Sequence, residues 1–303
     1  MAISRAQLAK ELEPGLNALF GLEYNRYENE HTEIFDEESS DRAFEEEVML
    51  GGFSTAPVKN EGQSISFDDA QETYTARYTH ETIALAFSIT EEAVEDNLYD
   101  RLASRYTKAL ARSMAQTKQI KAAAIMNNAF TAGVNAVGDG AALCSAAHPS
   151  LSGNQTNVLA VAADLNETSL EQMLIDIAGM TDERGLKIAV RGMKLIIPKE
   201  LQFIAERVIN SNLRSGTADN DNNAMKSMGM LPDGAVVNHF LTDTDAFFIK
   251  TDAPNGFKYF NRSAIKTAME GDFDTGNMRF KARERFCFGA SDWRCVYGTP
   301  GAA

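Results

Sequence analysis

Hydrophobic and polar positions separate an N-terminal stretch with few apolar residues from a longer part with clear helix and strand patterns. Ser4 and Gln7 have the spacing of a capping box and predict the start of a helix. Pro14–Gly15 predicts either the end of that helix or the start of a new one at Leu16. The stretch Glu23–Glu47 has only scattered apolar residues, so we expect an extended arm with few internal contacts.

Three segments between residues 51 and 89 have the alternation, or the Thr, Tyr and Ile content, that is typical of strands. They are Ser64–Asp68, Thr73–Thr79 and Ile83–Ile89, and the polar stretch Lys59–Gly62 predicts a turn before the first. A two-stranded projection is only marginally stable in water. We therefore expect this region to rest on another surface.

The stretch Thr90–Ala132 contains neither Gly nor Pro and predicts one helix of 43 residues, roughly 60 Å long at the usual rise. A coiled-coil seam alternates spacings of three and four. Here the apolar positions are spaced by four, which drifts about 40° per step on a helix. We therefore expect a spine that lies across a sheet with a contact face that rotates along its length. The positions are Val94, Leu98, Leu102, Tyr106, Leu110 and Met114.

The remaining chain mixes helix and strand patterns. Thr168–Arg184 predicts an amphipathic helix, and Ile188–Ile197 predicts a buried strand. Pro198 predicts the first turn of a further helix, and residues 211–229 predict a polar, mobile loop. Further strands are expected at Val236–Phe240, Ala246–Ile249, Phe257–Phe260 and Arg279–Phe288.

The chain has 303 residues and a net charge of −14, and residues 1–60 hold 13 acidic and 5 basic side chains. This balance argues against charge-driven binding of nucleic acid over the whole surface. An acidic run such as Glu23–Glu47 is typical of a solvated or disordered arm. The alternative is an arm that docks on a basic face of another copy or of a partner.

Length and composition narrow the class of protein. A chain of 303 residues suggests about two domains. No apolar run approaches the length of a membrane span, and the first 25 residues show no signal peptide. Three Cys without a C-x-x-C spacing exclude a disulfide scaffold. These features predict a cytoplasmic protein with reduced thiols and no membrane contact.

Catalytic motifs are absent from the sequence, including G-x-S-x-G, the P-loop, H-E-x-x-H and G-x-G-x-x-G. Cys144 and His148 are the one pair that suggests a thiol nucleophile with a base. They lie on one short stretch, so the interpretation that we favour is a small buried Cys and a His held before Pro149. A thiol enzyme remains the alternative of another class.

The first three ligand positions of a calcium-binding loop are matched by Asp219, Asp221 and Asn223. However, Ala224 and Met230 stand where such a loop needs Gly and Glu. The sequence therefore predicts no metal site, and it predicts no cofactor.

The order of parts along residues 50–297 is more specific than any single motif. The residues that carry it are Glu61-Gly62 with Phe67-Asp68, Phe87–Glu92, Glu95–Asn97, Ala111–Lys118, Asn127–Phe130, Asp139-Gly140 with Leu143–Pro149, Arg283–Phe288, and Asp292–Arg294 with Tyr297-Gly298. In this order they resemble the major capsid protein of a tailed bacteriophage with the HK-97-type fold. The stretch after the spine is similar to that of Mu-like prophage head subunits.

The resemblance implies an α+β fold of the HK-97 type. It implies an N-terminal arm at residues 1–50, an extended β-loop at 51–89 and a peripheral domain with the spine helix at 90–154. An axial domain would span residues 155–270. Residues 271–303 would return to the peripheral domain with a closing strand and a C-terminal tail.

The resemblance also implies a function. The chain would be a structural subunit, not an enzyme, and would self-assemble into hexamers and pentamers of an icosahedral head that encloses double-stranded DNA. It would belong to the virion capsid and assemble in the cytoplasm of a bacterial host. A separate scaffolding protein and a portal would be partners, and the packaged DNA would be contacted weakly.

Three segments are expected to contact neighbouring subunits. The contacting residues would be Lys59, Asn60, Glu61 and Gln63 in the extended loop; Arg214, Asp219, Asp221 and Asn223 in the axial loop; and Glu37, Glu38, Glu45 and Glu46 in the arm. An encapsulin-like nanocompartment shell, which holds a cargo enzyme in place of DNA, is the alternative within the same fold. A coiled-coil adaptor is disfavoured by the missing heptad.

Overall fold

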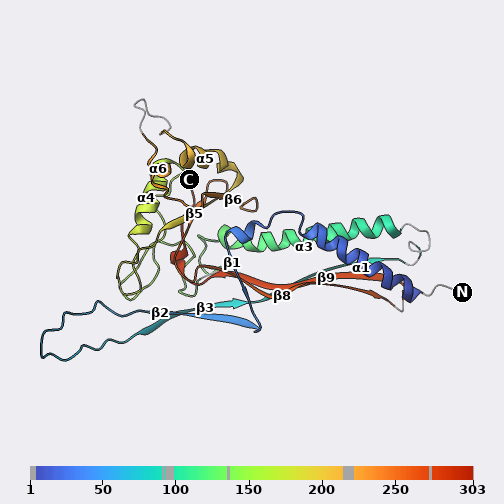
Figure 1. Cartoon of the computed structure of the whole chain (residues 1–303), viewed down its shortest axis with the longest axis horizontal. Coiled ribbons are helices and arrows are strands. Elements are labelled where there is room, and N and C mark those ends of the chain that lie inside the picture. The colour runs from blue at the N-terminus through green and yellow to red at the C-terminus, as the bar shows by residue number, and fades with distance from the viewer. Residues whose placement is uncertain are drawn as a thin grey trace.

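A long four-stranded sheet organises the fold. The structure is a computed structural model that describes residues 5–90, 92, 99–134, 137–213, 222–272 and 275–302. The sheet has the order β1-β8-β9-β4, and β8 and β9 pair along most of their length. Helices α1 and α3 lie along one face of it (Figure 1). The elements are β1 (Asp36–Ser39), β4 (Glu81–Ile89), β8 (Phe257–Gly271), β9 (Met278–Ala290), α1 (Arg5–Tyr24) and α3 (Tyr99–Asn127).

A compact domain stands at one end of this sheet (Figure 1). Its sheet has the order β10-β7-β5-β6, in which only β5 and β6 are parallel. Its elements are α4 (Glu167–Ala178), β5 (Gly192–Ile197), η2 (Lys199–Leu201), α5 (Gln202–Asn210), α6 (Ala224–Met228), β6 (Ala235–Val237), β7 (Phe247–Thr251), η3 (Trp293–Cys295) and β10 (Val296–Thr299).

One apolar cluster joins the compact domain to the long sheet. It contains Phe247 and Phe248 of β7, Met126 of α3 and Phe286 of β9. A second cluster lies between the two helices and the far part of the long sheet, where Phe20 of α1 packs with Met114 and Phe280. The compact domain and the long sheet are therefore not separated by a polar linker.

The strand and helix predictions in the second half of the chain are confirmed in type, but several ends differ: α4 ends at Ala178, β5 begins at Gly192 and β6 ends at Val237. The buried face of α4 contains Leu170, Met173, Leu174 and Ile177, and Asn166 and Ser169 form a capping box at its start. Strand β8 differs most, because it extends to Gly271 where the sequence predicted an end at Phe260. The predicted loop at residues 211–229 contains the short helix α6. Its polar second half forms a strand because β9 offers a partner along the whole length.

Helix α1 corrects the prediction that Pro14–Gly15 interrupts the N-terminal helix, since the helix continues through both residues. An interior proline costs a helix about 3 kcal/mol. Burial of Leu16 and Phe20 against α3 and β9 offsets that cost. Tertiary packing therefore decides the length of this helix.

Helix α3 confirms the predicted spine, but the residues that it buries differ from the predicted contact positions. Tyr106, an expected contact residue, is 49% exposed, whereas the small Ala103 and Ala111 are buried. The buried positions are Ala103, Thr107, Leu110, Ala111, Met114, Gln119, Ala122, Ala123, Ile125 and Met126. They recur at spacings close to 3.6, so one constant face of α3 is buried. Small residues were missed because they carry little hydrophobic signal, yet they allow α1 and the sheet to approach closely.

The ends of the spine also differ from the prediction. Helix α3 ends at Asn127, before the expected end at Ala132. At this end of the helix, the Asn127 side chain donates to Phe240 O and accepts from Thr242 N. Residues 91 and 93–98, including the predicted contacts Val94 and Leu98, lie outside the described residues. The 29 residues of α3 span roughly 44 Å.

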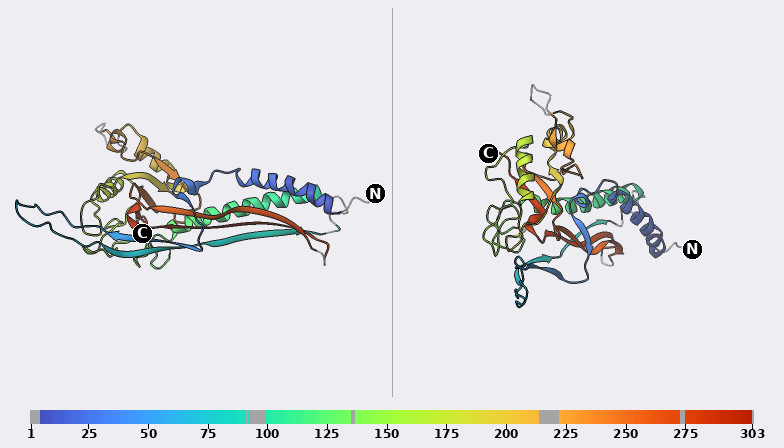
Figure 2. Two further views of the ribbon diagram at one scale, coloured as in Figure 1. Left: turned by 60° about the horizontal axis from the view of Figure 1, so that its bottom comes forward. Right: turned by 60° about the vertical axis from the view of Figure 1, so that its left-hand side comes forward.

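A two-stranded hairpin projects past the compact domain, away from the N-terminal end (Figures 1 and 2). Its strands are β2 (Phe44–Gly51) and β3 (Gln71–Thr79), and residues 52–70 form a loop between them. We call residues 44–79 the projecting hairpin and residues 52–70 the projecting loop. The predicted strand Ser64–Asp68 is wrong, because no neighbouring strand pairs with these residues.

The segment Ile83–Ile89, predicted as a strand within residues 51–89, is confirmed as β4. It pairs with β9 in the long sheet and is not part of the hairpin. In the described part of the chain, no helix is long and apolar enough to cross a membrane.

Candidate functional site

The projecting loop exposes apolar side chains in a way that a lone subunit does not explain. Phe67 is 95% exposed, Val58 89% and Ile65 70%. Large side chains of this kind are normally buried, and a cluster of them marks a surface that contacts another molecule. The loop therefore has the character of an interface that the described residues of this chain leave uncovered.

The expected contact residues Lys59, Asn60, Glu61 and Gln63 lie together at the tip of this loop, and all four are exposed. The predicted turn is present: Gln63 N donates to Asn60 O at 3.2 Å, and Gly62 has a φ of 81°. A positive φ favours glycine at this position. The structure places these residues where a neighbour could reach them.

The base of the projecting hairpin is fixed on the long sheet by polar and aromatic contacts. The Lys258 ammonium pairs with Glu47 of β2 and, at 3.2 Å, with Glu38 of β1. The Tyr78 hydroxyl bonds to Ser291, and the Tyr78 ring lies edge-on to Phe260 with centroids 4.9 Å apart. These contacts set the direction in which the loop projects.

Substituting Gly289 with Ala should loosen this attachment. A Cβ atom there would lie 2.5 Å from the Tyr78 ring, so the ring or the strand must shift. We expect Gly289→Ala to lower the free energy of unfolding by about 2 kcal/mol, measured by urea denaturation. Gly271→Ala is the control, because nothing lies within 4 Å of a Cβ at that position. Equal stability of the two variants would contradict the proposed attachment.

The acidic N-terminal segment corrects the expectation of an arm with few internal contacts. Glu37 accepts a hydrogen bond from Asn261, Glu45 accepts one from Ser40, and Glu46 pairs with Arg77 at 3.6 Å. In addition, β1 pairs in parallel with β8. Backbone pairing and lysines far away in the sequence hold the segment on its own chain, and no local pattern reveals them.

His31 of η1 (Glu30–Glu33) is the buried anchor of this segment. Its ring lies edge-on to Tyr259 and Phe288, with centroids 5.4 and 5.6 Å away. Its backbone N–H donates to the Gln119 side chain of α3. Burial among these rings lowers the pKa of His31 from 6.5 to about 4.

The low pKa of His31 predicts a loss of stability in mild acid. Above pH 6.5 the imidazole is neutral in both states and contributes no pH dependence. Between pH 6.5 and 4 the unfolded chain binds a proton that the folded chain does not, so stability falls as the pH falls. The full shift corresponds to about 3 kcal/mol and is complete below pH 4.

This loss should be visible in urea denaturation of unassembled subunits between pH 7 and pH 4. The His31→Gln variant is the reference, because glutamine does not titrate. We expect the stability difference between wild type and variant to shrink as the pH falls through this window. A difference that is constant with pH would refute the prediction.

The predicted axial-loop residues are only partly described. Arg214, Asp219 and Asp221 lie outside the described residues. Asn223 is buried, and its side chain accepts from Met225 N at the start of α6 and donates to Val208 O and Ser211 Oγ. Because these intrachain bonds occupy the amide, a contact of Asn223 with a neighbour would have to replace them.

The geometry of Cys144 and His148 argues against a thiol enzyme. Cys144 is buried, and burial raises the pKa of its thiol well above the ordinary value, which disfavours the reactive thiolate. Both ring nitrogens of His148 have other partners: Nδ1 lies 2.6 Å from Asp139 Oδ2, and Nε2 lies 3.0 Å from Asn157 Oδ1. The favoured sequence interpretation, a buried Cys with a held His, agrees with this arrangement.

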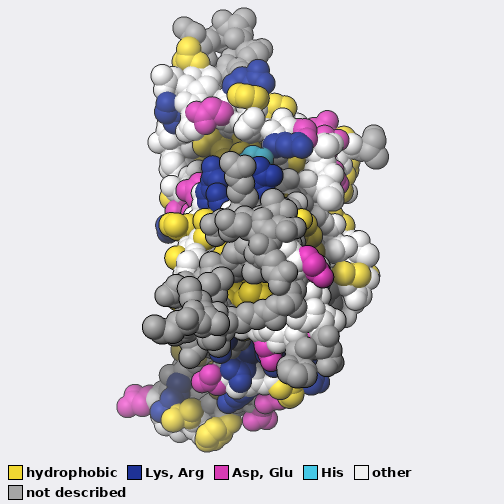
Figure 3. Space-filling model, turned by 90° about the vertical axis from the view of Figure 1, so that its right-hand side faces the viewer, with side chains coloured by type: hydrophobic (Ala, Val, Ile, Leu, Met, Phe, Trp, Pro, Cys, Tyr) yellow, Lys and Arg dark blue, Asp and Glu magenta, His cyan; other side chains and the backbone are white. Residues whose placement is uncertain are grey.

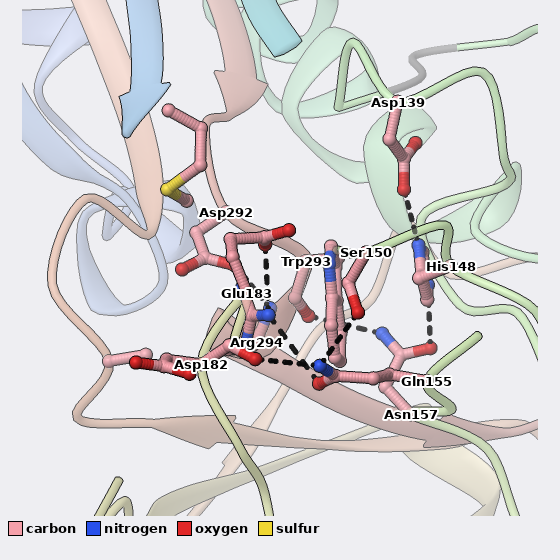
Figure 4. A network of polar contacts seen from close by, with 12 residues as sticks. Asp139, His148, Ser150, Gln155, Asn157, Asp182, Glu183, Asp292, Trp293 and Arg294 are labelled. Atoms are coloured by element: carbon pink, nitrogen blue, oxygen red, sulfur yellow. Dashed lines mark hydrogen bonds and ion pairs between the residues drawn. The ribbon is translucent and has the colours of Figure 1, made fainter. Parts of the chain in front are cut away.

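Asn157 is the centre of a buried polar network (Figure 4). Its Nδ2 donates to three backbone carbonyls, those of Leu143, Trp293 and Val296. Its Oδ1 accepts from Ser145 N at 2.8 Å. The carbonyls fix the orientation of the amide, so His148 Nε2 is the donor to Oδ1.

Arg294 is the second centre of the network (Figure 4). Its guanidinium pairs with Glu183 at 2.9 Å and with Asp292 at 3.2 Å, and its Nε donates to Thr181 O. The side chains of Arg294 and Glu183 are each 3% exposed. Burial raises the pKa of Asp292, although the adjacent Arg294 favours the ionised carboxylate.

An aromatic stack joins the two centres. The His148 and Trp293 rings are nearly parallel at 4.4 Å, and the Arg294 guanidinium lies 4.2 Å from the Trp293 ring centroid. The network thus ties the segment after the spine and the loop after α4 to the C-terminal segment. This role is structural: it holds three distant parts of the chain in register.

Sequence reasoning missed Asn157, Glu183 and Arg294 as key residues. A lone Asn in a polar loop has no periodicity, and a buried ion pair across more than a hundred residues leaves no spacing signal. Within the described residues, no group of three or more His, Cys, Asp and Glu side chains could hold a metal ion.

Three solved structures share this fold at low sequence identity, and two of them are phage or GTA capsids. The capsid of an empty GTA particle has a TM-score of 0.55 and 11% identity, covering 91% of this chain and 90% of that one. The capsid of Myoviridae phage XM1 has a TM-score of 0.53 and 11% identity, covering 88% of this chain and 89% of that one. The structure titled Mycobacterium phage Adephagia has a TM-score of 0.51 and 16% identity, covering 99% of this chain and 98% of that one. The fold is therefore that of phage capsid proteins with the HK-97-type architecture.

Residues 73–298 match the family described as Phage capsid protein, so the chain belongs to that family. It is a structural subunit of a phage head, part of the virion capsid, and it associates with further copies of itself. A search of curated proteins gives no match. The encapsulin-like alternative is not favoured, because the matching family is one of phage capsid proteins.

Proposed function

We propose that the chain assembles into hexamers and pentamers that close an icosahedral head around double-stranded DNA. The observation that carries the proposal is the projecting loop, whose exposed Val58, Ile65 and Phe67 have no cover within the described chain. A ring of subunits would supply that cover, since each loop could lie on the next subunit. The family membership supports the same assembly.

The proposed contacts between subunits fall into three groups. The projecting loop would contribute Lys59, Asn60, Glu61 and Gln63, which are exposed. The N-terminal segment would contribute Glu37, Glu38, Glu45 and Glu46, whose present ion pairs and hydrogen bonds would have to be shared or exchanged. The axial loop would contribute Arg214, Asp219 and Asp221, which lie outside the described residues.

The remaining parts of the proposal follow from the same family. The division into arm, extended loop, peripheral domain and axial domain would stay, with two changes: the extended loop would be residues 44–79, and β4 and β8 would belong to the long sheet of the peripheral domain. A scaffolding protein and a portal would be partners in assembly, which would take place in the host cytoplasm. Contact with DNA would be weak, because the chain carries a net charge of −14. We propose no catalytic role, in keeping with the buried thiol of Cys144.

Mass photometry and negative-stain electron microscopy of the recombinant chain test this proposal. Closed shells, or rings with six- and five-fold views, are the expected result. If wild type stays monomeric, it is expressed again with the neighbouring scaffolding gene. A monomer under that condition as well would refute the proposed assembly.

A variant of the loop tests the observation behind the proposal. Ile65→Ser/Phe67→Ser should keep the wild-type unfolding transition, because both residues are exposed, but it should form few or no shells. Ile175→Ser is the control, because Ile175 of α4 is 64% exposed and lies on the compact domain. Normal assembly of the loop variant would show that the loop does not make the contact.

A further inference from the structure

The projecting loop receives side-chain contacts from the rest of its own chain at a single place. Residues 52–70 are all exposed, and the strands of the hairpin pair only as far as Gly51 and Gln71. Among the described residues, Arg184 is the one residue outside the loop that forms a hydrogen bond or an ion pair with it. A long exposed loop can take many directions, so a single contact of this kind has a large effect on where the loop points.

Arg184 binds the loop at its base, where the two sides of the loop are joined. Its Nη2 donates to Asp69 O, and its Nη1 lies 3.6 Å from Asp68 Oδ1. Asp68 Oδ2 accepts from the backbone N and the Oγ of Ser54 at 2.7 and 2.6 Å, which links the two sides. The hydrogen bonds from Ser54 hold the pKa of Asp68 below its ordinary value, so the carboxylate stays ionised at neutral pH. We call Ser54, Asp68 and Asp69 the neck of the loop.

The turn that carries Arg184 is fixed by the buried network of the compact domain. The Asp182 side chain accepts from Arg184 N at 2.8 Å and so closes the turn. The adjacent Glu183 pairs with the buried Arg294, whose Nε also donates to Thr181 O. The loops that follow α4 lie next to the projecting hairpin (Figures 1 and 2). The backbone on the N-terminal side of Arg184 is therefore held in place, and its side chain reaches the neck from a fixed support.

The contact restrains the loop without covering its apolar side chains. Arg184 reaches only the neck, and Val58, Ile65 and Phe67 lie beyond the neck and stay exposed. The Arg184 side chain is 21% exposed and that of Asp68 36%, so water screens the ion pair and it contributes little to folding stability. An interaction of this strength still narrows the range of directions that the loop takes, because no other described residue outside the loop competes for it.

We propose that Arg184 is a positioning residue that aims the projecting loop before subunits meet. The inference rests on the proposed function, because it concerns how the loop is prepared for contact with another copy. A segment that is already fixed in its binding orientation loses less conformational entropy on association, so a restrained neck favours assembly. Without the guanidinium, Val58, Ile65 and Phe67 would be just as exposed but would point in many directions.

Spin labels measure the direction of the loop in unassembled subunits. Glu61→Cys places a label at the loop tip and Ile175→Cys places one on α4, where both native side chains are exposed. The native cysteines are buried, so the two new thiols are labelled selectively. Double electron–electron resonance should give a distance distribution roughly twofold wider when Arg184→Met is added to the labelled chain. A distribution of unchanged width would overturn the proposal.

Two further variants control for the loss of a charge and of an ion pair. Lys187→Met removes an exposed cation from the same turn. Arg279→Met breaks an ion pair with Asp272 at the opposite end of the long sheet; Figure 3 faces that end and shows basic and acidic side chains next to one another in its lower part. Both controls should keep the narrow distribution, and Arg184→Lys, which retains a charge and a donor, should restore much of it. Equal broadening in the controls would overturn the assignment to Arg184.

Assembly of the unlabelled chains is the second measurement. Arg184→Met should raise the protein concentration at which shells form about fivefold in mass photometry, while its urea unfolding transition stays at the wild-type position. Lys187→Met should assemble as wild type does. A widened loop distribution without any change in assembly would overturn the proposal. A wild-type chain that never assembles refutes the proposed function instead, and the spin-label distances, which need no assembly, then decide separately whether Arg184 aims the loop.

Discussion

Replacing Asn157 with Ala should lower the free energy of unfolding by about 4 kcal/mol. The substitution leaves the carbonyls of Leu143, Trp293 and Val296 without their donor, and Ser145 N without its acceptor. Each buried polar group that loses its partner costs about 1–3 kcal/mol, and water that enters the space recovers part of that cost.

The measurement is urea denaturation followed by tryptophan fluorescence. Trp293 is the single tryptophan of the chain and stacks on His148, so its emission reports the network directly. Asn154→Ala is the matched control, because Asn154 is exposed and close in sequence. We expect the control to stay within about 0.5 kcal/mol of wild type. A similar result for Asn157→Ala would mean that the network does not stabilise the fold.

Replacing Arg294 with Met should lower the free energy of unfolding by a comparable amount. The variant keeps most of the side-chain volume but leaves the Glu183 and Asp292 carboxylates buried without their cation. Breaking a buried pair in this way costs about 3–5 kcal/mol. The loss of the contact between the guanidinium and the Trp293 ring adds a smaller amount.

A double-mutant cycle separates the ion pair from general loss of packing. Glu183→Gln/Arg294→Met should be more stable than the sum of the single effects predicts, by at least about 1 kcal/mol, because the variant no longer buries an unpaired Glu183 charge. Arg191→Met is the control for an exposed arginine. Additive single effects would show that Arg294 and Glu183 do not act as a pair.

Several elements could be predicted because their signals are local. The absence of Gly and Pro after Thr90 predicted the spine, and the spacing of Leu170, Met173 and Ile177 predicted α4. The turn at Lys59–Gly62 was predicted from its polar residues and its glycine. Hydrophobic periodicity and turn residues depend only on neighbours in the sequence, so both can be recognised without knowledge of the fold.

The errors share a different cause. The helix through Pro14, the buried Ala103 and Ala111 of the spine, and the second half of β8 all depend on a surface supplied by a distant segment. The same holds for the acidic stretch, which lies on the chain because β8 offers a strand edge and Lys258 a charge. Propensity is a weak guide wherever tertiary packing contributes more free energy.

The sequence alone determined the order of parts and, through its resemblance to phage head subunits, the class of protein. It also favoured a buried Cys144 and a held His148 over a thiol enzyme. Only the tertiary structure brought Asn157, Glu183 and Arg294 into one network. The physical reason is that periodicity acts over a few residues, whereas a hydrogen bond between residues 157 and 293 exists only after the chain has folded.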